Sequence, residues 1–197
     1  MIVIGITGGI GTGKSIVSKI LKEELNLDVI DADELARKAV EQGSLGLKRI
    51  TEEFGTEVLK KDKTLDRKAL GDIIFNDESK RNALNSIVHP EVARLYAAEI
   101  EKYRSLRREY VIYDCPLLIE ASLAKKVDVV ILVRADRQTQ VRRIMERNGV
   151  SIEEANRRVD AQMPGDEKEK YADIILWNDG SLEELKRAIL SMWRNLF

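Results

Sequence analysis

A glycine-rich run near the start of the chain constrains its fold more than any other feature. Residues 8–17 read GGIGTGKSIV, which contains the spacing Gly-x-x-x-x-Gly-Lys-Ser. The fixed positions are Gly8, Gly13, Lys14 and Ser15. An apolar, β-branched run at residues 2–6 precedes the glycines, and apolar residues recur at helical spacing after them. Strand, glycine loop and helix in this order are typical of a Walker A loop, so we expect an α/β protein that binds nucleotide phosphates.

The chemistry of such a loop follows from its backbone. Glycines let successive N–H groups point into one concavity, and the N-terminus of the following helix adds partial positive charge. Lys14 is expected to reach the β- and γ-phosphates, and the Ser15 hydroxyl to bind Mg²⁺. Ile16 stands where a second hydroxyl is common, but its N–H is retained, so we expect a modest loss. The loop residues expected to bind ATP are Gly9, Gly11, Thr12, Gly13, Lys14, Ser15 and Ile16.

Apolar runs further along the chain predict the rest of the sheet. The expected strands are residues 2–6, a short run ending near Asp31, 109–118, 127–133 and 172–177. The expected helices after residue 40 are 44–54, 66–75, 89–103 with Pro90 in its first turn, 136–147, 151–162 and 182–193. Near-continuously apolar strands separated by helices indicate an α/β fold with a five-stranded parallel sheet covered on both faces.

Three carboxylates follow predicted strands. Asp31 and Asp33 lie at the carboxyl end of the second strand, and Asp114 follows the apolar run of the third. An acidic residue at the end of a strand beside a Walker A loop can hold Mg²⁺, which points to Asp114. One of the first pair could then accept a proton from an incoming hydroxyl. The alternatives are that Asp31 or Asp33 caps the next helix and that Asp114 binds local backbone.

Between residues 127 and 167 every basic residue is an arginine. Arg143 and Arg147 are four positions apart and share one helix face, as expected for a lid that closes over a triphosphate. The alternative is a solvated helix surface. Taken alone, His89, the only histidine, is expected to be a helix-start or packing residue. Cys115 is expected to be a small apolar residue at a strand end.

Composition excludes several other classes of protein. The formal net charge of −1 gives no global electrostatic reason to bind nucleic acid or an anionic membrane. No run approaches the ~20 apolar residues of a membrane span. One cysteine and one histidine argue against a disulfide framework or a zinc site. We therefore expect a cytoplasmic protein whose only metal is Mg²⁺ held by oxygen ligands. The oligomeric state stays open.

Several longer strings occur together and carry a resemblance to one family. They are GITGGIGTGKS, DADELAR, LDRKALGDIIFND, LNSIVHPEV, YDCPLLIEA, QVRRIMERNGVSIEEANRRVDAQMP and KYADIILWNDGS. In this order they resemble the dephospho-CoA kinase family over residues 5–181. The Walker A loop is shared by a large superfamily, whereas DAD, the His-Pro pair and AQMP together are specific. The departures are Ile16, where the family usually has threonine, and Trp177, where an acidic residue is more usual.

The resemblance implies a reaction and a three-part layout. MgATP would phosphorylate the ribose 3′-hydroxyl of dephospho-CoA, giving CoA and ADP, the last step of CoA biosynthesis. The nucleotide-binding core would be residues 1–31, 109–135 and 172–197, the helical CoA-substrate domain 32–108, and the lid 136–171.

The resemblance also implies residue roles. Asp33 would be the base, with Lys14 and Arg143 as the other catalytic residues. Arg143 and Arg147 would approach the phosphates, Asn178 the adenine of ATP. Metal ligands would be Ser15 and Asp114. The substrate-binding residues would be Asp33, Arg67, His89, Asp114 and Leu117.

Three other functions compete with this one. Another small-molecule kinase of the same fold could act on a nucleoside monophosphate or a sugar-like alcohol. A GTPase or assembly ATPase is disfavoured, because the Asp-x-x-Gly after the Walker B strand and the Asn-Lys-x-Asp motif of GTPases are both missing from the sequence. A silent binding protein is disfavoured because Lys14, Ser15, Asp33 and Asp114 are all present.

Overall fold

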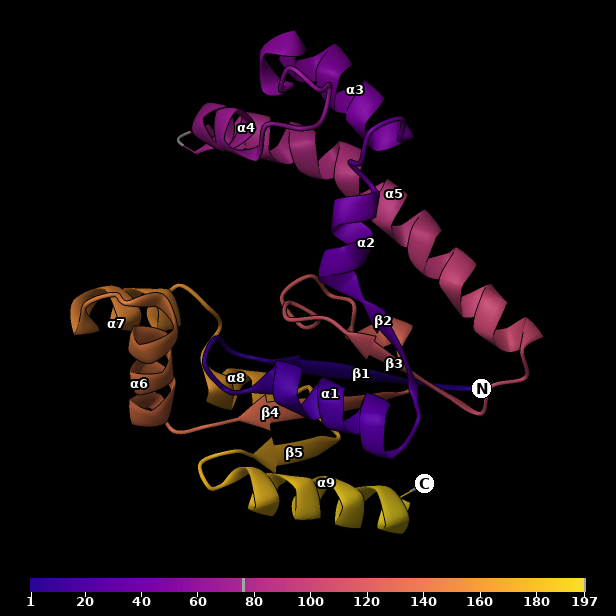
Figure 1. Cartoon of the computed structure of the whole chain (residues 1–197), viewed down its shortest axis with the longest axis vertical. Coiled ribbons are helices and arrows are strands. Elements are labelled where there is room, and N and C mark those ends of the chain that lie inside the picture. Colours follow the sequence, from indigo (N-terminus) through magenta and orange to yellow (C-terminus); the bar gives the residue numbers. More distant parts are fainter. Residues whose placement is uncertain (76, 197) are drawn as a thin grey trace. The chain divides into compact units, whose positions relative to one another are not determined.

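The computed structural model describes residues 1–75 and 77–196. Residues 76 and 197, which belong to the expected domains 32–108 and 172–197, lie outside that description. The expected five-stranded α/β sheet is confirmed (Figure 1). The strands are β1 (Ile2–Gly8), β2 (Asp28–Asp31), β3 (Tyr110–Asp114), β4 (Val129–Arg134) and β5 (Ile174–Trp177). Their order is β2-β3-β1-β4-β5, and β1 runs parallel to both β3 and β4.

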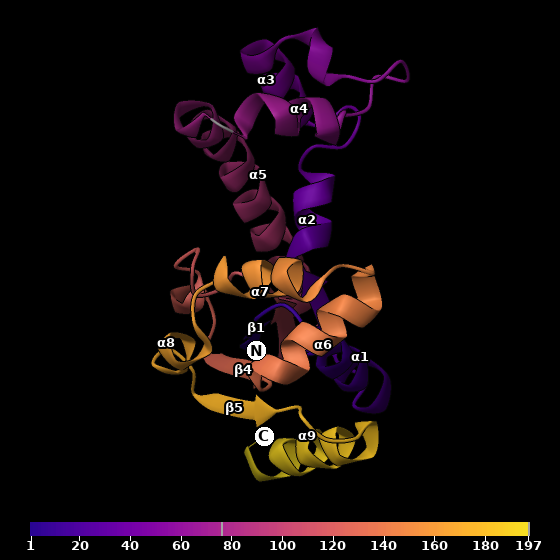
Figure 2. The ribbon, with the colours of Figure 1, turned by 90° about the vertical axis from the view of Figure 1, so that its left-hand side faces the viewer.

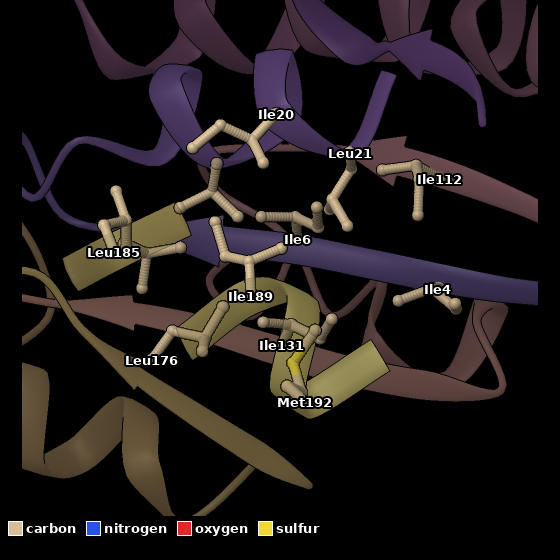
Figure 3. Close-up of a cluster of buried hydrophobic side chains, with 12 residues drawn as sticks. Ile4, Ile6, Ile20, Leu21, Ile112, Ile131, Leu176, Leu185, Ile189 and Met192 are labelled. Carbon is tan, nitrogen blue, oxygen red and sulfur yellow. The ribbon is translucent and has the colours of Figure 1, made fainter. Parts of the chain in front are cut away.

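One face of the sheet is covered by α1 (Lys14–Glu24) and α9 (Leu182–Leu196). Ile4 and Ile6 of β1, Leu21 of α1 and Ile189 of α9 are all fully buried in the core between them (Figure 3). Each such aliphatic side chain contributes about 1.5–3 kcal/mol when it leaves water. Since β1 is paired on both sides within this packed layer, the loop that follows Gly8 starts from a rigid base.

Three helices follow β4 and precede β5 in the chain: α6 (Arg137–Asn148), α7 (Ile152–Asp160) and α8 (Gly165–Glu169). Helices α6 and α7 lie side by side (Figure 2). They enclose a small core of Val141, Ile144 and Ala155. Gly149 ends α6 in the left-handed conformation (φ 63°), and the Ser151 hydroxyl caps α7 by accepting the Glu154 N–H at 3.3 Å. The sequence signals for this turn are therefore local.

The chain forms two compact units, residues 1–29 with 107–197, and residues 30–106. The second unit contains α2 (Ala32–Lys38), α3 (Leu45–Phe54), the short 3₁₀ helix η1 (Thr56–Val58), α4 (Arg67–Ile74) and α5 (Glu78–Ser105). Ile50, Val58 and Leu70 form part of its own hydrophobic core. Helices α2, α3 and α4 begin at the side chains of Asp31, Ser44 and Asp66, each of which accepts a backbone N–H of the first turn.

The two largest differences from the expected element boundaries are at the start of α5 and at the end of β3. Helix α5 begins at Glu78, after the Asp77 side chain caps it by accepting the Lys80 N–H at 3.0 Å, so the prediction that Pro90 opens a helix was wrong. Pro90 is exposed and lies inside the helix. The helix begins before it because Leu84 and Val88 of the preceding turns pack on the core of the second unit.

The third strand ends at Asp114 rather than at residue 118. The chain turns there, where the Leu118 N–H donates to the Cys115 carbonyl at 3.3 Å. The short helices α8 and η2 (Ala124–Lys126) were not expected at all. No helix within residues 1–75 and 77–196 is both long and apolar enough to cross a bilayer.

Candidate active site

The phosphate loop connects Gly8 at the end of β1 to Lys14 at the start of α1. Gly11 (φ 80°) and Gly13 (φ 88°) take left-handed backbone conformations that other residues rarely adopt. A Cβ on Gly11 would lie 2.7 Å from the carbonyl oxygen of Gln140, and one on Gly13 would overlap the Asn178 amide. Both glycines are therefore required by conformation and by space, and Gly13 is the second fixed glycine of the motif.

Lys14 and Asp114, both expected at the phosphates, contact each other. The Lys14 ammonium forms an ion pair with Oδ1 of Asp114, and the Ser18 hydroxyl donates to Oδ2 at 2.6 Å. Lys14 and Ser18 are one turn apart on α1, while Asp114 ends β3, which pairs with β1. Ser18 was missed by the sequence analysis, although its place four residues after Lys14 on the same helix face is a usable signal. Both carboxylate oxygens of Asp114 are thus engaged.

The next two residues of α1 face solvent. Ser15 is exposed, and the Ile16 side chain is 40% exposed. The Ile16 N–H, which we expected to be available to a phosphate, donates to the Gly13 carbonyl at 2.9 Å. This hydrogen bond belongs to the first turn of the helix. The amide would have to share or release it before binding a phosphate oxygen.

Two glutamines that the sequence analysis missed bind the backbone of the phosphate loop at Ile10. The Ile10 N–H donates to Oε1 of Gln162 at 2.7 Å, and Nε2 of Gln140 donates to the Ile10 carbonyl at 2.8 Å. Gln140 lies on α6 and Gln162 follows α7. Both polar groups of Ile10 are therefore bound by the segment that was expected to form the lid. Gln162 belongs to the string AQMP, which was the available signal.

Arg143 and Asn178 also contact the loop backbone. Nδ2 of Asn178, a buried residue directly after β5, donates to the Thr12 carbonyl at 2.8 Å. The Arg143 guanidinium donates weakly to the carbonyls of Gly11 (3.3 Å) and Thr12 (3.4 Å). Arg147, one turn further along α6, is exposed and donates to the side chain of Asn148. The two arginines of the expected pair thus have different surroundings.

A cavity of about 350 Å³ lies beside the loop and contains side chains of both charges. Its lining includes Gly9, Thr12, Arg134, Arg137, Asp160 and Lys168. Arg137 binds both carboxylate oxygens of Asp160, at 2.7 and 3.0 Å, and this contact lowers the pKa of Asp160 below its ordinary value of 3.8. Arg134 is likewise paired, with Asp166 at 2.8 Å and Glu169 at 2.5 Å, so most charges of the lining are already paired within the protein.

The remaining residues that were expected in the active site make no hydrogen bond or ion pair with the phosphate loop in the part of the chain that the structure describes. Asp31 is the cap of α2, since its carboxylate accepts the Glu34 N–H at 3.0 Å, as the alternative interpretation held. Asp33 is exposed in the first turn of the same helix, and it makes no hydrogen bond or ion pair within residues 1–75 and 77–196. Arg67 and His89 are exposed on α4 and α5 of the second unit. Leu117 is 49% exposed in the turn after β3.

Comparison with known proteins decides the family. The family model described as dephospho-CoA kinase matches residues 2–184. This chain belongs to the dephospho-CoA kinase family. Two curated members of the family, from Geobacter metallireducens and Bacillus cereus, are each 46% identical to it. The first match covers 98% of this chain and 96% of the relative, and the second 98% and 97%.

The solved structures that are similar to this chain include one of a dephospho-CoA kinase. A crystal structure from Thermus thermophilus is 40% identical, with a TM-score of 0.83 over 100% of this chain and 98% of that one. The dephospho-CoA kinase from Campylobacter jejuni is 28% identical, with a TM-score of 0.76 over 98% and 96%. A shikimate kinase from Acinetobacter baumannii, 16% identical with a TM-score of 0.54 over 99% and 94%, shares the fold alone.

Proposed function

We propose that this protein transfers the γ-phosphoryl group of ATP to the ribose 3′-hydroxyl of dephospho-CoA. The observation that carries the proposal is the family match over residues 2–184, which includes both the phosphate loop and the helical second unit. In the transfer, the bond between the γ-phosphorus and the β–γ bridging oxygen breaks. A bond from the 3′-oxygen to the same phosphorus forms, and ADP leaves.

On the nucleotide side, Lys14 would exchange its contact with Asp114 for the β- and γ-phosphates of ATP. Arg143 and Arg147 would bind the transferring group, and Asn178 would border the adenine. Mg²⁺ fits the donors present, because the Ser15 hydroxyl and the Asp114 carboxylate are hard oxygen ligands and substrate phosphates supply the others. When bound, Mg²⁺ neutralises charge on the phosphate oxygens. Asp114 stays oriented by Ser18 throughout.

On the acceptor side, Asp33 would orient the ribose hydroxyl and take its proton. Its exposed carboxylate, which is not used to cap α2, supports this role. Arg67, His89 and Leu117 would bind dephospho-CoA. The proposed layout has a nucleotide-binding core of residues 1–31, 109–135 and 172–197, an acceptor domain of 32–108 and a lid of 136–171. A single cysteine suits a reducing cytoplasm.

The test is an assay of ADP release by the purified chain with MgATP, in the presence and absence of dephospho-CoA, followed by mass spectrometry of the product. We expect release that depends on dephospho-CoA and a product carrying one added phosphate on the ribose. Shikimate, nucleoside monophosphates and simple sugars serve as competing acceptors, and the Lys14→Ala variant controls for contaminating kinases. The proposal would be overturned if any of those acceptors were phosphorylated in preference to dephospho-CoA, or if ADP release did not depend on any acceptor.

A further inference from the structure

One ionisable pair of the first unit has no part in the mechanism above. Lys168 of α8 is only 1% exposed, and its ammonium lies 2.6 Å from Oε1 of Glu120. Within residues 1–75 and 77–196 neither the amine nor the carboxylate makes a hydrogen bond to any other group. Each charge is therefore balanced by the other alone.

Stability does not explain such a pair. Removing an amine and a carboxylate from water costs more than their attraction returns unless further hydrogen bonds satisfy them, and two apolar side chains of similar volume are often at least as stable. Glu120 and Lys168 lack those further hydrogen bonds. What an ion pair supplies and an apolar pair does not is a single, directional arrangement of the two segments that carry it.

Those segments both lead to the phosphate loop. Glu120 lies in the connection of residues 115–123, which begins directly after Asp114 and is fixed to β1, since the Thr7 hydroxyl donates to the Pro116 carbonyl at 2.9 Å. Lys168 lies six residues after Gln162, whose side chain accepts the Ile10 N–H. The pair thus closes a ring of contacts from the phosphate loop through residues 162–168 to residues 115–123 and back to β1.

We propose that Glu120 and Lys168 are positioning residues for phosphoryl transfer, which hold residues 115–123 in the register that the acceptor needs. This inference rests on the proposed function, because Leu117, exposed in the same connection, is assigned there to the acceptor site. Lys168 also lines the cavity beside the phosphate loop, but its ammonium is paired with Glu120. Because Glu120 lies in the same connection as Leu117, loss of the pair should affect dephospho-CoA and turnover more than ATP. Misplacement of a reacting group by ~1 Å can cost about 10²-fold in rate.

The decisive variant is the double replacement Glu120→Met with Lys168→Met, which keeps the side-chain volume and removes both charges. We expect its melting temperature to equal or exceed that of the parent. We also expect kcat/KM for dephospho-CoA to fall about 10- to 100-fold, while the Kd for ATP changes less than about twofold. Amide hydrogen exchange should become faster in residues 115–123 and stay unchanged in β1 and β4.

Two further variants separate geometry from charge. The swap of Glu120→Lys with Lys168→Glu restores an ion pair of reversed polarity and should recover most of the lost kcat/KM. Lys170→Met, which removes the exposed 2.7 Å pair with Glu167 at the end of the same helix, is the matched control and should behave as the parent.

The outcomes distinguish this inference from the proposed function. If the parent enzyme does not phosphorylate dephospho-CoA, the proposed function fails. If the parent is active and the double methionine variant has unchanged kinetics for both substrates, the pair is structural only and the inference is overturned. The inference is also overturned if that variant loses affinity for ATP as much as for dephospho-CoA.

Discussion

The phosphate loop and the expected acceptor residues differ in how much of their geometry the protein itself supplies. The loop is held by side chains from three other segments: Gln140 and Arg143 of α6, Gln162 after α7, and Asn178 after β5. In contrast, Asp33, Arg67 and His89 of the second unit are all exposed. The proposed nucleotide site is thus held by contacts within the protein, while the proposed acceptor site has side chains whose partners would be substrate atoms.

Substitutions in the two regions should therefore act at different stages of the reaction. Substitutions in the loop remove a contact that exists before any ligand binds, so they should change nucleotide binding and the transition state together. Substitutions of exposed acceptor residues remove no contact of the free protein. They should leave its stability unchanged and act only when substrate is present.

The largest effect is expected for Lys14→Ala. The γ-phosphate would lose its nearest cation, and turnover should fall about 10²-fold or more. The variant also leaves the buried Asp114 carboxylate without its ion pair, so its melting temperature must be measured beside its kcat. Lys19→Ala, which alters an exposed lysine of the same helix, is the control. Near-normal turnover by a folded Lys14→Ala enzyme would refute the Walker A assignment.

A smaller loss is expected for Arg143→Lys and Arg147→Lys. Lysine keeps the charge but not the planar fork that binds two oxygens at once. Loss of a hydrogen bond to a charged group costs about 1.5–3 kcal/mol, or roughly tenfold and more in kcat. Arg143, which already contacts the loop, should show the greater effect. Arg142→Lys, in an exposed position of the same helix, is the control. Parent-like kinetics in both variants would assign these arginines to the solvated surface.

The smallest effect is expected for Ile16→Thr. The added hydroxyl would make at most one hydrogen bond, worth about 0.5–1.5 kcal/mol, so the KM for ATP should change only a few-fold. Ile16→Val has the shape of threonine without the hydroxyl and isolates its contribution. Since the Ile16 side chain is 40% exposed, neither substitution should disturb the core. An improvement in ATP binding of about 100-fold would show that Ile16 is a costly departure from the usual loop.

The sequence could predict features set by local structure but not contacts between residues far apart in the chain. Gly11 and Gly13 were predictable because a local backbone conformation requires glycine, and the strands because their apolar runs are continuous. Gln140 and Gln162 were not, since each contacts Ile10 from more than 100 residues away in the chain. The prediction that Pro90 opens a helix was wrong because the packing of α5 on its own unit outweighs the local preference of proline for a first turn.

We propose that Asp33 acts on the acceptor while Asp31, two residues earlier, only caps α2. Single-turnover phosphoryl transfer tests it, with ATP bound first and dephospho-CoA then added, in Asp33→Asn and Asp31→Ala. Asp33→Asn should retain the parent melting temperature and the Kd of both ligands, but transfer at least ~10²-fold more slowly. Asp31→Ala should lose about 0.5–2 kcal/mol of stability and transfer at nearly the parent rate per folded molecule. Unchanged transfer by Asp33→Asn, with a large loss in Asp31→Ala, would contradict these roles and make Asp31 the base.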